Sequence, residues 1–353
     1  MTNPYAQLAD QALADQLPDP TQARWVLDGK DVELLPLLDA AFKPRLAHFG
    51  RSVSIHVLNN IQNGLCPEDC GYCAQSKVST AAIRQYKMKS DEEIFEGAEA
   101  AAKGGAVRYC MALSGRGPSV QRARRLGDLI ARLKAEYGME ICLSAGIMGD
   151  EQAKILAEAG LDRLNHNLNT SESHYSKITT THSYQDRVDT LAAAQRNGIE
   201  TCSGLIIGMG EESEDIIEVG FKLRELETPS IPVNFLIPIE GNPVTEDGSL
   251  TPERCLRTLC LMRFINPRAE IRMAGGREGN LRGLQSMGLY PANSLFVGGY
   301  LTTRGDPFAE TYAMIEDAGF EVAGQGKGDR AAPGFQLAGQ GALLRPDVAA
   351  VPE

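Results

Sequence analysis

The chain has 353 residues, of which 43% are hydrophobic and 23% are charged, a composition typical of a globular protein with room for one large domain and extensions. Its 35 basic and 46 acidic residues give a net charge of −11, which argues against a general nucleic-acid binder or an anionic-membrane binder. There is no apolar run of bilayer length and no signal-peptide pattern at the first residues, so we expect a cytoplasmic protein. Eight cysteines in a chain of this length predict reduced thiols rather than a disulfide scaffold.

The elements expected along the chain begin with two helices before Gly50, at Thr21–Leu27 and Leu35–Ala47. After Gly50, short apolar strands alternate with amphipathic helices. The strands are expected at Ser54–Gln62, Val107–Ala112, Glu140–Ser144, Arg163–Leu168, Glu200–Ile207, Pro232–Pro238, Glu270–Met273 and Ser294–Val297. The helices are expected at Asp91–Lys103, Val120–Tyr137, Glu151–Ala159, Tyr184–Asn197, Ser213–Leu226, Pro252–Ile265 and Leu281–Met287.

Eight strand–helix repeats predict an α/β fold, a (β/α)8 barrel of the TIM type, although a doubly wound open sheet would give a similar pattern. Polar residues at the ends of the strands favour the barrel, where function gathers at the C-terminal ends. We therefore expect a helical extension over residues 1–50 and a barrel over residues 51–323. A tail rich in Gly, Ala and Pro, residues 324–353, is expected to be mobile.

Three cysteines, Cys66, Cys70 and Cys73, form a Cys-x3-Cys-x2-Cys pattern in one short loop. A four-iron cube that is fully ligated uses four cysteines, so a triplet indicates one iron left open for a small molecule. Zinc ribbons pair two Cys-x2-Cys knuckles, and ferredoxins place a fourth cysteine after a tighter triplet. A structural zinc with a distant fourth ligand remains the alternative.

Three more cysteines, Cys110, Cys142 and Cys202, fall on the second, third and fifth predicted strands. If the barrel closes, their thiols can face a common lumen and form a second metal constellation. Each one taken alone is more typical of a small buried apolar residue. Arg272, on the seventh strand, would by itself be interpreted as an ion-pair partner, because a guanidinium is charged and has no lone pair to donate.

The triplet segment Asn63–Ser76 resembles the radical S-adenosylmethionine enzymes and, among them, the biotin synthase family. The resemblance extends from about Leu35 to about Arg304. It is carried in order by Arg108–Met111, Ser114–Pro118, Glu140–Cys142, Asn165–Ser171, Cys202–Gly204, Gly208–Glu211 and Arg272–Glu278.

This resemblance implies a [4Fe-4S] cluster on Cys66, Cys70 and Cys73, whose open iron binds S-adenosylmethionine. It also implies a [2Fe-2S] cluster on Cys110, Cys142, Cys202 and Arg272. An electron from the cube would split S-adenosylmethionine to a 5′-deoxyadenosyl radical, which abstracts hydrogen from dethiobiotin, and sulfur from the [2Fe-2S] cluster would complete biotin. The implied residues around S-adenosylmethionine are Tyr72, Asn167, Asn169, Gly208 and Gly210, and those around dethiobiotin are Asn167 and Asn234.

Two positions depart from the family pattern: Asn169 stands where members carry Asp, and Gln62 where some carry Lys. The resemblance also implies a homodimer and a reductase, flavodoxin- or ferredoxin-type electron donor. Two alternatives stay open. One is another radical S-adenosylmethionine barrel, such as a methylornithine-synthase-like mutase or a cofactor maturase, and the other is an iron–sulfur scaffold or electron carrier without a substrate.

Overall fold

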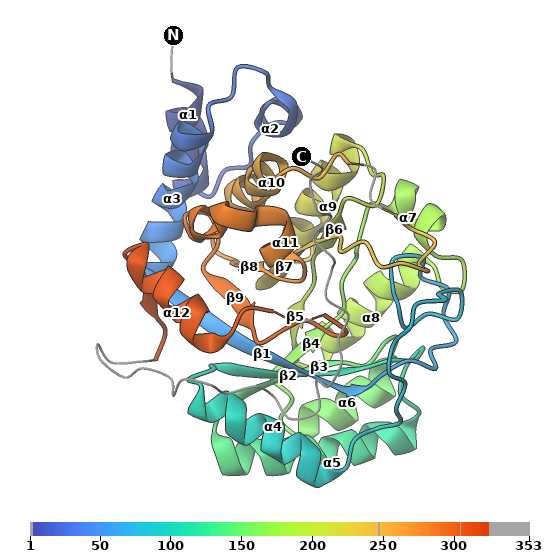
Figure 1. Ribbon diagram of the computed structural model, residues 1–353. Coiled ribbons are helices and arrows are strands. Elements are labelled where there is room, and N and C mark those ends of the chain that lie inside the picture. Colours follow the sequence, from blue (N-terminus) through green and yellow to red (C-terminus); the bar gives the residue numbers. More distant parts are fainter. Residues whose placement is uncertain (1–2, 246–247, 304, 325–353) are drawn as a thin grey trace, which may run out of the picture.

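The centre of the computed structural model, which describes residues 3–245, 248–303 and 305–324, is a closed parallel barrel (Figure 1). Its strands pair in chain order, β6 pairs with β7, and β9 pairs back onto β1. The sequence prediction of a (β/α)8 barrel rather than an open sheet is confirmed. The strands are β1 (Ser52–Gln62), β2 (Arg108–Leu113), β3 (Glu140–Ser144), β4 (Arg163–Asn165), β5 (Glu200–Cys202), β6 (Leu205–Ile207), β7 (Ser230–Phe235), β8 (Glu270–Met273), β9 (Ser294–Val297) and β10 (Glu321–Val322).

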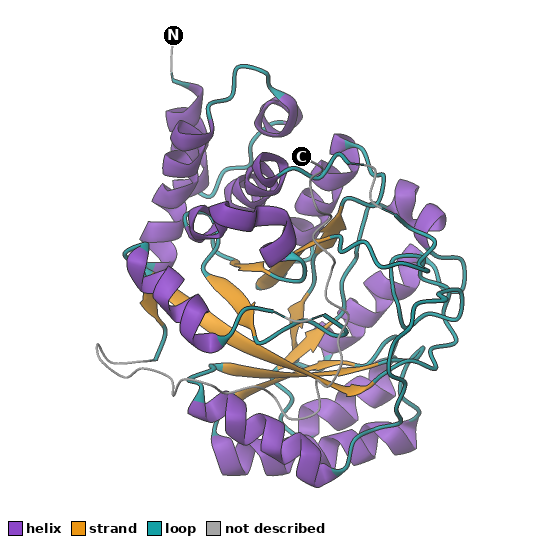
Figure 2. Cartoon of the chain, in the orientation of Figure 1, coloured by secondary structure: helices purple, strands orange, loops and turns teal. Residues whose placement is uncertain are grey.

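Helices surround these strands (Figure 2). α5 illustrates why they form: the Ser119 hydroxyl accepts from the Arg122 amide at the first turn, Gly138 ends the helix in the left-handed conformation, and the face with Leu126 and Leu133 is buried. The helices are α1 (Pro4–Leu13), α2 (Pro20–Asp28), α3 (Leu34–Phe49), α4 (Asp91–Lys103), α5 (Val120–Tyr137), α6 (Asp150–Glu158), α7 (Glu172–Ile178), α8 (Tyr184–Arg196), α9 (Ser213–Glu225), α10 (Pro252–Ile265), α11 (Arg277–Leu281), the 3-10 helix η1 (Arg282–Leu289) and α12 (Phe308–Asp317). None of the helices in the described ranges is long and apolar enough to cross a membrane.

The N-terminal helices α1, α2 and α3 pack against α10, which Figure 1 shows above the barrel. Arg257 of α10 holds this extension by donating to the carbonyl oxygens of Leu27 (3.2 Å) and Gly29 (3.0 Å). The sequence pattern missed α1, although Asn3 and Pro4 are a cap and a first-turn proline typical of a helix start. The domain boundaries stay a prediction, and residues 325–353 of the expected tail lie outside the described residues.

Alternation along the strands decides which side chains enter the barrel. On β2, Tyr109 and Met111 join the large apolar core between strands and helices, whereas Cys110 and Ala112 belong to a small separate cluster that also contains Cys142. On β8, Ile271 and Met273 face the helices, so Glu270 and Arg272 face the lumen. Arg108 of β2 faces the lumen too, where it contacts Glu270. The lumen therefore holds Cys110 and Cys142 among its side chains, together with several buried charges.

The predicted strand Glu200–Ile207 is divided into β5 and β6. At Gly204 the chain passes so close to β7 that a Cβ atom would lie 1.9 Å from the carbonyl oxygen of Pro232. Only glycine permits this approach, and the ladder is interrupted there. The predicted helix Leu281–Met287 is likewise different: α11 ends at Leu281 and a 3-10 helix follows.

Candidate active site

A cavity of about 280 Å³ lies over the C-terminal ends of the barrel strands. Both cysteine sets border it: the triplet from the loop after β1, and Cys110 and Cys142 from β2 and β3. Four further residues expected from the sequence also line it, namely Tyr72, Asn167, Asn169 and Asn234. The structure thus brings most of the predicted site residues together around one space.

The second cysteine set is assembled by strand register. Cys110 and Cys142 are direct partners across β2 and β3, and Cys202 pairs with Asn165 of β4. The Cys202 sulfur accepts from Asn165 Nδ2 (3.3 Å) and from Arg272 Nη1 (3.4 Å). Cys202 and Arg272 do not line the cavity themselves but meet in the lumen, where both are fully buried.

Burial raises the pKa of the Cys66 and Cys70 thiols, and it raises the pKa of Cys73 to about 12. The pKa of Cys142 is also raised, first by its hydrogen bond with Cys110 and then by burial. These thiols are neutral until a metal centre supplies the positive charge that thiolates require, because a coordinating thiol loses its proton outright.

Three residues that line the cavity each carry a buried side-chain polar atom with no hydrogen-bond partner within the described part of the chain. These atoms are Asn60 Oδ1, His166 Nε2 and Asn167 Oδ1. Buried polar groups in native proteins are almost always paired, so these atoms await a polar ligand. Together with the thiols on one rim they fit an iron–sulfur cluster that holds a polar small molecule.

Within the described residues, no three His, Cys, Asp or Glu side chains form a set that could bind a single metal ion. A cluster does not need such a set, because each thiolate of a cube binds a different iron. The donor chemistry of the triplet and of the lumen set therefore fits iron–sulfur clusters.

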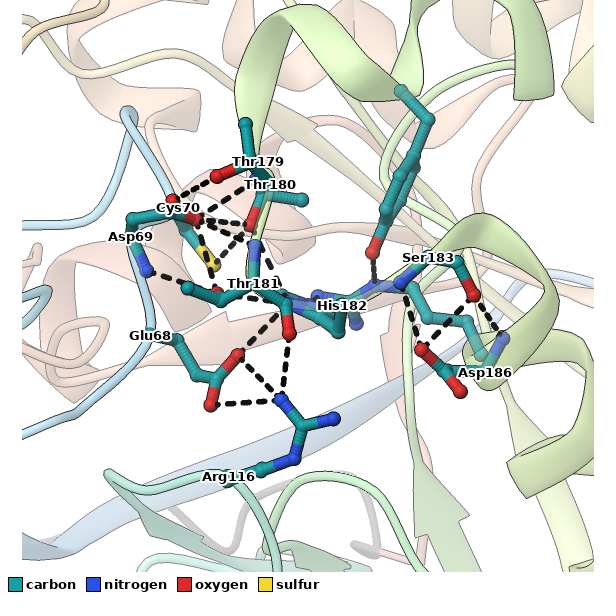
Figure 3. Close-up of polar contacts among 12 residues, drawn as sticks. Glu68, Asp69, Cys70, Arg116, Thr179, Thr180, Thr181, His182, Ser183 and Asp186 are labelled. Atoms are coloured by element: carbon teal, nitrogen blue, oxygen red, sulfur yellow. Dashed lines mark hydrogen bonds and ion pairs between the residues drawn. The ribbon is translucent and has the colours of Figure 1, made fainter.

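The triplet loop is held by the segment that follows α7, residues 179–182 (Figure 3). The Asp69 carboxylate accepts from the backbone amides of Thr180 (2.9 Å) and Thr181 (3.1 Å) and from the hydroxyls of Thr179, Thr180 and Thr181. These bonds hold the pKa of Asp69 well below its usual range, against the opposing effect of burial. The amide of Gly71 also donates to the Ile178 carbonyl (2.8 Å), so the loop is fixed on both sides of Cys70.

A series of contacting polar side chains, all buried except Arg116, connects the same loop to α8. Arg187 faces His182, with 2.8 Å between Nη2 and Nε2, and His182 Nδ1 lies 3.0 Å from the Glu68 carboxylate. Because Arg187 can only donate, we assign the proton of neutral His182 to Nδ1. Burial lowers the pKa of His182, consistent with a neutral ring. Arg116 closes the chain by donating to Glu68 (3.3 Å), as Figure 3 shows.

Asn169 has φ = 72°, in the left-handed region that asparagine tolerates better than most residues. Its side-chain amide donates to the Tyr72 hydroxyl (2.6 Å), and its backbone joins Gly204 and Ile206. The hydrogen-bonded pair of Tyr72 and Asn169 therefore joins the triplet loop to the segment after β4 at the edge of the cavity. The departure from Asp therefore suits both the backbone conformation and the donor bond to Tyr72.

Other predicted residues lie differently. Gly208 and Gly210 border a separate surface depression beside α9 and α10, so their role toward S-adenosylmethionine stays a prediction. Asn234 ties strand ends together, since its amide donates to the Leu205 carbonyl (3.1 Å) and its oxygen accepts from Gly275 (3.0 Å). Gln62 does not line the cavity, but its side-chain amide donates to the carbonyl oxygen of Ser114 (2.7 Å), a residue that does.

Sequence reasoning missed four titratable residues that line the cavity: Glu68, Arg116, His182 and Arg187. Arg187 carried a usable signal, because it lies on a helix between buried positions, where a lone Arg is unusual. Glu68 lay inside the triplet loop itself. His182 gave no signal, since only the fold brings it to the loop.

Two family models match the chain: the Radical SAM superfamily over residues 61–222, and the Biotin and Thiamin Synthesis associated domain over residues 232–321. The chain is 56% identical over 324 residues to a biotin synthase of Acaryochloris marina, covering 91% of this chain and 94% of that protein. It is 55% identical to a biotin synthase of Magnetococcus marinus, covering 89% and 98%.

Among solved structures, the chain resembles methylornithine synthase, with a TM-score of 0.78, 21% identity, and coverage of 90% of this chain and 97% of that one. It also resembles an FeFe-hydrogenase maturase of Carboxydothermus hydrogenoformans, with a TM-score of 0.76, 16% identity, and coverage of 90% and 79%. At these identities, both are evidence for the fold alone.

Proposed function

The chain belongs to the biotin synthase family and is a radical S-adenosylmethionine enzyme that inserts sulfur into dethiobiotin to form biotin, and we propose that the cavity over the barrel is where it does so. The observation that carries this proposal is that one cavity is bordered by the cysteine triplet, by two cysteines of the second set and by residues with unpartnered buried polar atoms. This arrangement gives a radical source and a sulfur source access to one substrate.

Cys66, Cys70 and Cys73 would hold the [4Fe-4S] cluster, and S-adenosylmethionine would bind its open iron. When bound, the cube supplies the electron that splits the sulfonium to a 5′-deoxyadenosyl radical, which can attack an unactivated C–H bond. Arg187 offers a buried cation to the carboxylate of S-adenosylmethionine, since it lines the cavity with hydrogen-bonding capacity to spare. Tyr72 and Asn169 present hydroxyl and amide groups to the ribose.

Asn167 is well placed to bind S-adenosylmethionine or dethiobiotin, because the residue lines the cavity and its buried side-chain oxygen has no partner in the described part of the chain. Asn234 can offer its remaining N–H to the ureido group while its other contacts hold it in place. Apolar side chains such as Leu58 and Phe296 limit water in the same space, which protects a radical from side reactions.

Cys110, Cys142, Cys202 and Arg272 would hold a [2Fe-2S] cluster, which supplies the sulfur. The support is that these four residues converge in the lumen from four strands. A mutase or maturase on the same fold would have no need for the complete set.

The experiment that tests these roles compares alanine variants of the two sets under anaerobic conditions. Cys70→Ala should abolish both 5′-deoxyadenosine and biotin formation. Cys202→Ala should still release 5′-deoxyadenosine but make no biotin. Undiminished biotin formation by the second variant would rule out the sulfur-donor assignment.

The remaining parts of the proposal concern partners. A flavodoxin- or ferredoxin-type protein with its reductase would deliver the electron, and the chain would act in the cytoplasm as a homodimer. These follow from the family. A size measurement on the holoenzyme and a donor-dependence assay test them.

A further inference from the structure

We propose that Glu270 is the positioning residue of the lumen site: its carboxylate binds one end of the Arg272 guanidinium and thereby presents Nη1 toward Cys202. The inference rests on the proposed [2Fe-2S] assignment and adds a residue that does not itself bind iron. Glu270 is two residues before Arg272 on β8, so the strand period places both in the lumen.

Glu270 gathers donors from around the barrel. Its Oε1 accepts from the hydroxyls of Ser294 (2.9 Å) and Ser230 (3.3 Å), and Arg272 Nη2 donates to the same oxygen. Arg108 donates to both carboxylate oxygens, at 3.3 and 3.1 Å. His56 Nε2 lies 3.1 Å from Oε1. The carboxylate is therefore held by β1, β2, β7 and β9 as well as by Arg272 of its own strand.

This arrangement fixes how Arg272 lies. Nη2 is engaged by Glu270 and by the Ser230 hydroxyl (2.8 Å), while Nη1 points to the Cys202 sulfur (3.4 Å). The Phe296 ring lies 5.0 Å from the guanidinium carbon and blocks one face. A rotation that exchanged the two nitrogens would break the contacts of Nη2. Nη1 is accordingly the atom that faces Cys202 and that would bind a metal there once the guanidinium has given up a proton, since the charged group has no lone pair.

Glu270, whose own side chain is only 13% exposed, also balances charge in a place with little solvent. The side chains of Arg108 and Arg272 are 3% and 0% exposed, so two guanidinium groups share the lumen. A buried cation without a compensating anion is strongly unfavourable. Glu140 contacts Arg108 too, at 2.7 Å, but its side chain is 46% exposed and it has no contact with Arg272. Glu140 is therefore the matched control.

The test compares wild type, Glu270→Gln and Glu140→Gln by Mössbauer spectroscopy after anaerobic reconstitution. Glutamine keeps the shape but loses the charge. For Glu270→Gln we expect at least a twofold lower occupancy of the second cluster and a changed quadrupole doublet for its iron at the arginine side. The cube signal and 5′-deoxyadenosine formation should not change. Glu140→Gln should match wild type in both clusters.

A second cluster in Glu270→Gln that matches wild type in occupancy and spectrum would overturn the inference. If that variant does not fold, Ser294→Ala removes one donor to Glu270 with little change in volume. We expect a smaller change in the same direction, and a wild-type spectrum there would overturn the inference equally. Absence of any second cluster in wild type would instead overturn the proposed cofactor assignment on which the inference rests.

Discussion

Asp69 is the contact through which the triplet loop is most firmly held, and Asp69→Asn measures what that contact contributes. The substitution preserves volume and leaves one oxygen to accept hydrogen bonds. It removes the charge that the Thr179–Thr181 segment surrounds with two amides and three hydroxyls (Figure 3).

The magnitude follows from the kind of bond that is lost. A hydrogen bond to a charged group contributes about 1.5–3 kcal/mol and a neutral one about 0.5–1.5 kcal/mol. Four of the five bonds share one oxygen and the site is partly exposed to solvent, so their sum is discounted. We expect the free energy that favours the closed triplet loop to fall by about 2 kcal/mol, which raises the fraction of molecules with an open loop roughly 30-fold.

The assay follows the rate at which an iron chelator bleaches the reconstituted cube. Asp69→Asn should lose the cube about 30 times faster than wild type if loop opening limits attack. Asp186→Asn is the control, because Asp186 caps α8 through Ser183 (2.8 Å) in the same region but does not touch the triplet loop. Equal bleaching rates for Asp69→Asn and wild type would refute the reasoning.

Three further outcomes follow from the structure. Asn169→Asp should bind S-adenosylmethionine up to about tenfold more tightly, because a carboxylate forms charge-assisted bonds to a ribose diol; an unchanged dissociation constant would remove Asn169 from the ribose site. Burial lowers the pKa of His56 to about 3. Below pH 6.5 the unfolded chain therefore binds a proton that the folded chain does not bind, and the folded state becomes less stable as the pH is lowered. When the pH is lowered from 7 to 5, the free energy of unfolding of the apoprotein should fall by about 2 kcal/mol more for wild type than for His56→Gln. Equal decreases for the two proteins would contradict this. Arg272→Ala should retain some biotin formation in buffers whose components can bind iron in place of the arginine. If the variant's activity is the same in all buffers, Arg272 does not bind a metal.

The barrel was predictable from the sequence because apolar strands and amphipathic helices alternate with little interruption. The same alternation predicted that Cys110 and Cys142 could share a lumen, and the register pairs them directly. The split at Gly204 was not predictable, since it depends on the approach of Pro232 from the next strand.

The buried charges were harder to foresee. Glu270 and His56 are separated by more than 200 residues and meet only because β9 closes the barrel between β8 and β1. The ion-pair interpretation of Arg272 is confirmed, because Nη2 pairs with Glu270; the other end of the guanidinium faces Cys202, and its role at a cluster stays a prediction. No local pattern in the sequence predicts that the two ends of the Arg272 guanidinium have different contacts.

The central claim is that one cavity serves two clusters, one that generates a radical and one that gives up sulfur. The most direct measurement is Mössbauer spectroscopy of the anaerobically reconstituted protein during turnover with S-adenosylmethionine, dethiobiotin and a reductant, with biotin and 5′-deoxyadenosine quantified in parallel. We predict two cluster signals, with the [2Fe-2S] signal declining as biotin appears. A single cube that yields 5′-deoxyadenosine without biotin, or biotin formed while the [2Fe-2S] signal stays constant, would contradict the account.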